Sequence, residues 1–287
     1  MSLIDFRNDF LVEVEDRLAG FDAEAATDNQ LMAKGALFKM AANIGEVDFL
    51  ALSALRKLET LSGAQLQTWL ADLSNLAAFY QLLDNGPVVQ AIAANSTAMA
   101  SIAGCAHALN AVIANQAVLE IVAANPAAWT AFKSGAGLTA TSIPTMTGYS
   151  APSGDAIGSS SLGAGNEYWR AFDKASNNWA AGSGLVTNQW VGYKFPAPVF
   201  IHTFTLDSTY SAGHSSNSQV KDIKLQCSSD GVAWSDVVVK TLVNGGYSNT
   251  FDVVKSTRFA YWRLFAVDNF GDATNLSVRE IDLAGFQ

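Results

Sequence analysis

The stretch QWVGYKF (189–195) decides the fold class of the second half of this 287-residue chain. Its side chains alternate in character, so that Val191, Tyr193 and Phe195 fall on one face of an extended strand. Similar runs follow between turns rich in Gly, Ser, Asn and Asp, namely VFIHTFTL (199–206), VKDIKLQCSS (220–229), VAWSDVVVK (232–240), SNTFDVV (248–254), FAYWRLFAV (259–267) and LSVREIDLAGF (276–286). Such a series predicts an antiparallel β-sandwich of the jelly-roll type.

The first half of the chain follows a helical pattern instead. Apolar residues recur there at spacings of three and four, which predicts helices over residues 3–18, 30–41, 47–61 and 64–83. Asn85-Gly86-Pro87 is a stop signal after the last of these. Acidic side chains cover the face of the first helix that lies opposite its apolar stripe. That helix is either an ordinary solvated amphipathic helix or a docking helix for a partner protein.

Charge is unevenly distributed along the chain. Residues 1–86 carry 13 acidic and 6 basic side chains, residues 87–140 carry one of each, and residues 141–287 carry 12 and 10. The net charge of −9 therefore belongs mostly to the first helical region. Because the chain is acidic and lacks an apolar run of membrane-spanning length, we expect neither a nucleic-acid partner nor membrane insertion.

The sequence between residues 87 and 134 repeats with a period of ten. The blocks are AIAANSTAMA (91–100), SIAGCAHALN (101–110), AVIANQAVLE (111–120) and IVAANPAAWT (121–130). Ten residues are not a whole number of helical turns, so one straight helix would rotate its apolar stripe away from any partner. The alternative is one continuous Ala-rich helix in which the periodicity is accidental.

The fifth position of the blocks indicates where short helices turn. It is Asn95, Cys105, Asn115 and Asn125 in successive blocks. Asn tolerates the left-handed backbone that ends a helix, and the residues after it suit a helix start. We therefore predict an array of short helices that pack on their neighbours. These blocks also resemble the Ala/Ser/Met repeats of bacteriophage tail and tail-fibre proteins, over about 40 residues.

Four motifs occur in a fixed order in the second half. They are WRAFD (169–173) with NW (178–179), QWVGYKF (189–195), SDGVAW (229–234) and VREIDLAG (278–285). In this order they resemble the coagulation-factor type C (discoidin) family of the galactose-binding-like superfamily, over about residues 149–287. The resemblance implies a jelly roll of about eight strands. It also implies a ligand, usually a sugar and sometimes a lipid or protein, bound by loops at one end.

The same resemblance implies a structural Ca²⁺. Carried over residue by residue, the metal residues are Asp173 and Glu280, which would supply side-chain oxygens, and Ser176, whose loop would supply backbone carbonyls. Ca²⁺ binds oxygen ligands from several segments, so it would tie these distant parts of the chain together.

The family pattern of the calcium loop is broken at two points in this sequence. Lys174 stands where the family has a glycine, and the loop Ala175-Ser176-Asn177 is neutral. The alternative is that Asp173 caps a turn and that Glu280 pairs with Arg170 or Lys174.

The sugar site of the family is only partly matched. Sugar-binding members carry a histidine after the first motif and an arginine in the loop before the fourth strand, whereas here Ala180 follows Trp179 and loop 210–217 lacks arginine. An aromatic ring with a few directed polar groups is what a sugar site requires. The candidate ligand-binding residues are therefore Trp179, Tyr210, His214, Asn217, Asn269 and Phe270. The alternative is that these loops are simply solvated.

Catalysis is not indicated by the sequence. Its three histidines form no H-E-x-x-H or H-x-H pattern, and G-x-S-x-G and G-K-[ST] motifs are missing. The carboxylates of Asp268 and Asp272 could act as an acid and base only in a desolvated cleft, which their short Gly-flanked loop does not predict. The two cysteines lie in regions of different character, so a disulfide framework is not expected. We expect a protein without enzymatic activity.

These features predict an α+β multidomain chain. A helical region (1–86) would dock on a virus particle, followed by short-helix repeats (87–134), a linker (135–148) and a β-sandwich (149–287). We expect a phage tail or tail-fibre component of the virion, assembled in the host cytoplasm, that binds host-surface carbohydrate. Its partners would be other tail proteins and further copies of itself.

Two other functions are compatible with the same sequence. The first is a purely structural virion protein, such as a baseplate or decoration subunit, whose sandwich contacts other proteins. The second is the accessory carbohydrate-binding module of an enzyme, which the lack of catalytic motifs in the first 148 residues disfavours.

Overall fold

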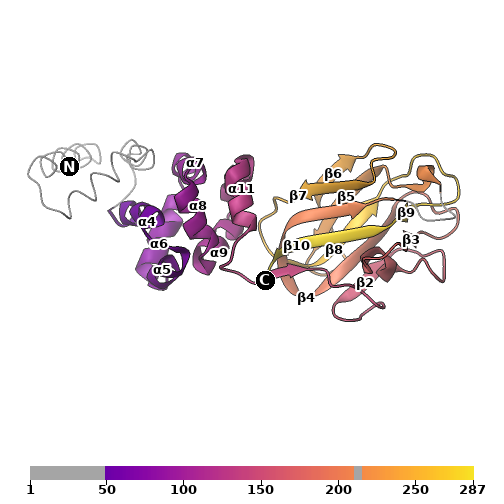
Figure 1. Cartoon of the computed structure of the whole chain (residues 1–287), viewed down its shortest axis with the longest axis horizontal. Coiled ribbons are helices and arrows are strands. Elements are labelled where there is room, and N and C mark those ends of the chain that lie inside the picture. The colour runs from indigo at the N-terminus through magenta and orange to yellow at the C-terminus, as the bar shows by residue number, and fades with distance from the viewer. Residues whose placement is uncertain (1–48, 210–214) are drawn as a thin grey trace, which may run out of the picture. The chain divides into compact units, whose positions relative to one another are not determined.

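The chain forms two compact units. The computed structural model describes residues 49–209 and 215–287 (Figure 1). Unit 1 ends at Leu138, and unit 2 comprises Thr139–Gln287. The expected helices over residues 3–18 and 30–41 lie outside the described residues.

The segment expected to be a linker, residues 135–148, is partly built into unit 2. Strand β1 (Ala140–Ser142) pairs with the last strand of the chain. Ile143 and Met146 are buried in the core of the same unit. The linker prediction is therefore wrong for this part, because two apolar side chains among the Gly, Thr and Ser residues are taken up by the sandwich.

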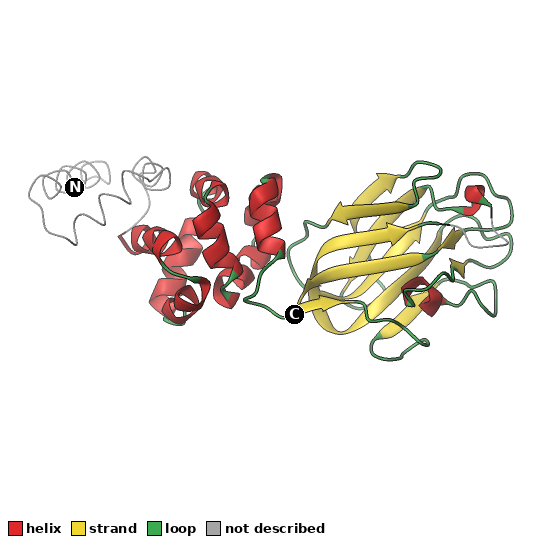
Figure 2. Ribbon diagram, in the orientation of Figure 1, coloured by secondary structure: helices red, strands yellow, loops and turns green. Residues whose placement is uncertain are grey.

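Unit 2 is an antiparallel β-sandwich, as predicted (Figure 2). Its other strands are β2 (Asp155–Gly158), β3 (Trp179–Ala180), β4 (Gln189–Asp207), β5 (Asp222–Ser228), β6 (Ser235–Thr241), β7 (Ser248–Asp252), β8 (Phe259–Ala266), β9 (Ser277–Val278) and β10 (Glu280–Phe286). One layer contains β2, the first part of β4, β8, β5 and β6, and the other contains β1, β10, the second part of β4 and β7. Strands β3 and β9 form a separate pair.

Strand β4 belongs to both layers. Residues 189–194 pair with β2 and β8, and residues 200–207 pair with β10 and β7. The sequence predicts two strands here, but they join into one whose pairing with β8 shifts register between Lys194 and Val199. Pro196 and Pro198 lie in that exposed stretch, where a missing N–H removes no ladder hydrogen bond.

The core of unit 2 confirms the period-two pattern of the sequence. Val191, Tyr193 and Phe195 of β4 are buried together, as expected for one face of the strand. Alternate residues of the neighbouring strands β5 and β8 extend this buried face of the layer, namely Ile223, Leu225, Cys227, Trp262, Leu264 and Ala266. The intervening residues of these strands point away from the core, which leaves one face of this layer open to solvent.

Unit 1 is helical. Its described helices are α4 (Phe49–Thr60), α5 (Gly63–Trp69), α6 (Leu73–Leu83), α7 (Gly86–Ala94), α8 (Ser96–Ala103), α9 (Ala106–Ala114), α10 (Gln116–Ala124) and α11 (Pro126–Lys133). The helix predicted over residues 64–83 is in fact two, because Asp72 accepts hydrogen bonds from the N–H groups of Ser74 and Asn75 and so starts a new helix. Within the described residues no single helix could span a membrane, although α8 and α9 meet the length and composition test as a pair bent by 101°.

The ten-residue repeat forms short helices, as predicted, but the asparagines act differently from the expectation. Asn95, Asn115 and Asn125 have extended rather than left-handed backbones. Each uses its side-chain oxygen to accept hydrogen bonds from the second and third residues of the helix that follows. The asparagine is thus an N-cap for the next helix and not a left-handed end of the previous one.

Two of these caps also tie distant helices together. Asn95 Nδ2 donates to Glu59 Oε1 at 2.6 Å, and Asn125 Nδ2 donates to the carbonyl of Ala93 at 3.1 Å. Accordingly α8 packs on α4 and on α11, and α7 packs on α10. Helices three apart in the repeat therefore lie side by side, which explains why the array buries Ile, Val, Leu and Met at a period of ten.

Candidate functional site

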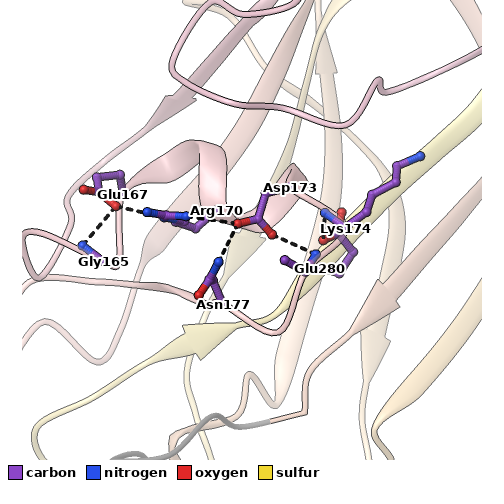
Figure 3. A network of polar contacts seen from close by, with 8 residues as sticks. Gly165, Glu167, Arg170, Asp173, Lys174, Asn177 and Glu280 are labelled. Carbon is purple, nitrogen blue, oxygen red and sulfur yellow. Dashed lines mark hydrogen bonds and ion pairs between the residues drawn. The ribbon is translucent and has the colours of Figure 1, made fainter.

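Two acidic side chains from distant parts of unit 2 lie next to each other, as the family resemblance implies (Figure 3). Asp173 follows the short helix η1 (Tyr168–Phe172), and Glu280 begins β10. The backbone N–H of Lys174 donates to Glu280 Oε2 at 2.8 Å and joins the two segments.

Hydrogen bonds within its own loop hold Asp173 in place. Its Oδ1 accepts from the N–H of Ala175 at 2.9 Å, and its Oδ2 accepts from Asn177 Nδ2 at 2.9 Å. Arg170 Nη1 lies 3.4 Å from the same Oδ2, and its Nε also contacts Glu167. Asp173 therefore caps a turn, as the alternative to a metal site predicts, but Arg170 pairs with Asp173 and not, as that alternative had it, with Glu280.

Only one oxygen of the Glu280 carboxylate has a hydrogen-bond partner. Its Oε1 is buried and has no hydrogen-bond partner. Burial raises the pKa of this carboxyl group to about 8; the N–H of Lys174 opposes the rise, and the nearby charge of Asp173 adds to it. A cation between the two carboxylates would satisfy the unpartnered oxygen and reverse this shift, so these residues fit a Ca²⁺ ion.

The side chain of the remaining metal residue of the expectation does not join this pair, and the backbone carbonyl expected from its loop stays a prediction. Ser176 is exposed and makes no hydrogen bond with Asp173 or Glu280. Lys174 directs its ammonium group to Asp282, 3.7 Å away, and not to Glu280. Among the described residues no group of three or more His, Cys, Asp and Glu side chains is suited to hold a metal, so further ligands would have to be carbonyls or water.

A second candidate site lies where three loops of unit 2 meet. We call residues 215–219, 242–247 and 268–275 the loop cluster. The carbonyl of Asn217 accepts hydrogen bonds from the N–H groups of Phe270 at 3.0 Å and Asp272 at 3.4 Å. The carboxylate of Asp272 also accepts from the hydroxyl of Ser215 at 2.6 Å and from the N–H groups of Thr274 and Asn275, and these three bonds hold its pKa well below its usual range. Asp272 thus stays ionised and organises the cluster.

An amide pair and an aromatic ring are presented by this cluster. Asn244 Nδ2 donates to Asn217 Oδ1 at 3.2 Å, and both side chains are exposed. Among the contacts of the described residues, Asn217 Nδ2 and Asn244 Oδ1 take no part, so the NH2 group of Asn217 can donate and the amide oxygen of Asn244 can accept. Phe270, which is bonded to Asn217 through the backbone, is half-buried and packs on the core with part of its ring accessible.

Two predicted ligand residues are corrected by the structure. Trp179 is completely buried, and its indole N–H donates to the carbonyl of Ser160, so it is a core residue and not a ligand contact. Asn269 is also buried, and its amide bonds the backbone of Gly271, Asp272 and Asn275 within its own loop. Sequence spacing alone does not reveal that both polar groups are already used.

Four of the predicted ligand residues remain, namely Tyr210, His214, Asn217 and Phe270. Asn217 and Phe270 come from loops distant in the sequence and are brought together. Tyr210 and His214 lie outside the described residues.

Three polar residues were not singled out from the sequence as candidates, and two of them, Gln219 and Asn244, belong to the loop cluster. Gln219 is buried and accepts from the N–H of Gly245, while its Nε2 has no partner. Asn178 is buried too, and its Oδ1 has no partner although its Nδ2 donates to the carbonyl of Thr209. Asn244 belongs to an Asn-Gly-Gly turn, which in the sequence signals only a change of direction.

Comparisons with known proteins give structural likenesses only. No protein-family model matches the sequence, and neither does any curated protein. Chitosan-binding module 1 from a chitosanase/glucanase of Paenibacillus sp. IK-5 is 26% identical, with a TM-score of 0.38 over 46% of this chain and 95% of its own. A Clostridium perfringens CBM32 module in complex with GalNAc-β-1,3-galactose is 18% identical, with a TM-score of 0.41 over 50% of this chain and 99% of its own. The F5/8 type C domain of a Bacteroides fragilis protein is 16% identical, with a TM-score of 0.39 over 47% and 92%.

Proposed function

We propose that unit 2 binds a neutral glycan through the loop cluster. The observation that carries this proposal is the junction of Asn217, Asn244 and Phe270. There the NH2 group of Asn217 and the amide oxygen of Asn244 lie in one exposed pair of side chains. The carbonyl of Asn217 accepts from the backbone N–H of Phe270, whose ring is half-buried. A sugar ring has an apolar face for the phenyl group and vicinal hydroxyl groups that both donate and accept hydrogen bonds.

The order within the cluster supports binding without large rearrangement. Backbone and side-chain hydrogen bonds from Asp272 and Asn217 fix the loops to each other before any ligand arrives. Binding then costs little conformational entropy in the protein. It is reversible and needs no catalytic group, in keeping with the lack of a catalytic motif in the sequence.

We also propose that Asp173 and Glu280 hold a structural Ca²⁺. The support is the buried Glu280 oxygen without a partner beside a second carboxylate. The ion would neutralise both charges and fasten the loop after η1 to strand β10. It would act on the stability of unit 2 and not on the ligand directly.

The biological setting we propose is a phage tail or tail fibre. The ten-residue repeats resemble those of tail proteins, and the acidic helical region would dock on the particle. The glycan would then belong to the host surface. Several copies on one particle would multiply a modest affinity for each sugar.

A purely structural virion role is the competing proposal. It is favoured by Ala180, which is fully buried at the position where sugar-binding relatives of the expected family carry histidine. In that case the loop cluster would contact another protein and not a sugar. Imaging of a particle separates the two proposals, since a loop cluster that faces solvent supports adhesion and one buried against neighbouring subunits supports assembly.

Binding of the full-length chain to an array of bacterial glycans tests the main proposal. We expect retention on a subset of neutral glycans, and loss of that retention in Asn217→Ala and Asn244→Ala. Ser235→Ala, at the other end of strand β6 from the loop cluster, is the matched control and should bind like the wild type. Equal binding by all four proteins would contradict the proposal.

A further inference from the structure

The outer face of one sandwich layer carries a group of aromatic rings around an arginine. Strands β4, β8 and β5 lie side by side, and their register places Trp190 opposite Phe265 and Gly192 opposite Arg263. The neighbours of these residues in the chain, such as Val191 and Leu264, are buried in the core. Trp190, Arg263 and Phe265 therefore point away from the core, on a face where a sandwich usually has polar residues.

The arginine is held by stacking on the rings. Arg263 Cζ lies 4.0 Å from the ring centre of Trp234, 4.9 Å from that of Trp190 and 5.5 Å from that of Phe265. The two indoles are themselves 6.2 Å apart. Trp234 is fixed by a hydrogen bond from its Nε1 to the carbonyl of Gly231. We call Trp190, Trp234, Arg263 and Phe265 the platform.

The guanidinium group of the platform has no counter-charge in contact, since the carboxylate of Asp236 acts on it only from beyond ion-pair distance. Its Nε donates to the neutral Gln226 Oε1 at 2.7 Å, and among the described residues no carboxylate forms an ion pair with it. The flanking lysines differ, because Lys224 pairs with Asp236 at 2.8 Å and Lys194 pairs with Asp155 at 3.5 Å. Burial lowers the pKa of Arg263 from its ordinary value. A half-buried cation with no carboxylate in contact is costly, and a ligand carboxylate that contacts it would offset that cost.

We propose that the platform binds the carboxylate of an acidic sugar, such as a uronate residue of a polysaccharide. The planar guanidinium fork has two terminal nitrogens available, which match the two oxygens of a carboxylate. The pyranose ring would cover the accessible parts of the neighbouring indoles. An acidic peptide is the less suitable partner, because its carboxylates carry no flat apolar ring for these surfaces.

This site is separate from the loop cluster. The two sites share no residue, because the platform side chains lie on the outer face of the layer, from Phe265 near the end of β8 to Trp234 just before β6, whereas the loop cluster contains the segments before β5, after β6 and after β8. The inference therefore does not depend on the proposed binding of a neutral glycan. A variant of the loop cluster, Asn217→Ala, should leave binding at the platform unchanged.

Affinity electrophoresis of the full-length chain in gels with polygalacturonate tests the proposal. We expect the wild type to be retarded relative to gels with neutral dextran, and its dissociation constant to rise at least tenfold in Arg263→Gln. Lys240→Gln removes the same charge from an exposed position on β6 and should be retarded like the wild type. Arg263→Lys keeps the charge but not the fork and should also lose most of the retardation.

The controls make failure recognisable. Near-ultraviolet circular dichroism shows whether each variant is folded. If Arg263→Gln is not folded, Arg263→Lys replaces it in the comparison with the wild type. Equal mobility of the wild type in both gels would overturn the proposal, as would equal retardation of the wild type and a folded Arg263 variant. Retardation by polyglutamate as strong as that by polygalacturonate would also overturn it, because the platform would then select charge and not an acidic sugar.

Discussion

The backbone N–H of Lys174 donates a 2.8 Å hydrogen bond to Glu280 Oε2 and so joins two positions 106 residues apart. The contact places the charge of Asp173 beside the buried carboxyl group of Glu280, whose second oxygen has no partner. A buried acid with this surrounding destabilises the fold when it is ionised without a cation.

The first prediction concerns pH in the absence of metal. The pKa of Glu280 is raised to about 8 in the folded chain, so the folded state holds this proton more tightly than the unfolded state does. The stabilising contribution of the protonated group is fully present below its ordinary pKa of 4.5 and is lost as the pH rises towards 8. With a chelator present, urea unfolding should show a fall in the free energy of unfolding over this range that is smaller in Glu280→Gln. An identical pH dependence of the two proteins would show that this carboxyl group is not perturbed.

The second prediction concerns calcium. Added Ca²⁺ should raise the melting temperature of the wild type at neutral pH, because the ion binds only the folded arrangement of the two carboxylates. Asp173→Asn and Glu280→Gln should abolish this shift, whereas Asp282→Asn, which removes an exposed partner of Lys174, should retain it. Differential scanning fluorimetry with and without a chelator measures the shift. A wild-type melting temperature that does not respond to Ca²⁺ would rule the site out.

The third prediction separates the capping and tying roles of the repeat asparagines. Asn115→Ala removes only an N-cap and should lower the free energy of unfolding of unit 1 by about 1 kcal/mol. Asn125→Ala removes a similar cap and also the bond to the Ala93 carbonyl, so it should cost about 2 kcal/mol. Urea unfolding followed by circular dichroism at the helical band compares them. The account of the array is wrong if Asn115→Ala is the more harmful change.

The fourth prediction concerns the bulge where β10 meets β4. A Cβ atom at Gly285 would lie 1.8 Å from the carbonyl oxygen of Phe200, so Gly285→Ala must push the two strands apart. We expect a loss of roughly 1–3 kcal/mol or more in the stability of unit 2. Gly148→Ala meets no atom within 4 Å and should be nearly neutral. Tryptophan fluorescence during urea unfolding reports the difference, and equal stability of both variants would contradict the described register.

The sequence was informative where a periodic pattern repeats over many residues. The period of ten predicts the short helices, and the period of two predicts the buried face of β4. The capping role of the repeat asparagines could not be predicted from the sequence. Asn suits both a helix end and an N-cap, and only the backbone angles distinguish the two. Ile143 and Met146 show the same limit, since two apolar residues in a polar stretch do not reveal which core will take them up.

The candidate sites were harder to predict than the fold. Asp173 and Glu280 lie next to each other, as the resemblance of the motifs implies, and Asn217 meets Phe270. Trp179 fails as a ligand residue because its ring fills the core. Asn244 and Arg263 were not found, because their surroundings arise from loop contacts and strand register that a single sequence does not display.

The most direct test of the central claim is glycan binding by the full-length chain with and without the exposed amide pair. Asn217→Ala and Asn244→Ala each remove one partner of the pair without touching the core. The account predicts that both variants keep the wild-type melting temperature. Their affinity for the glycans that bind the wild type should fall at least tenfold. Unchanged binding by both folded variants would contradict the assignment of the loop cluster as the glycan site.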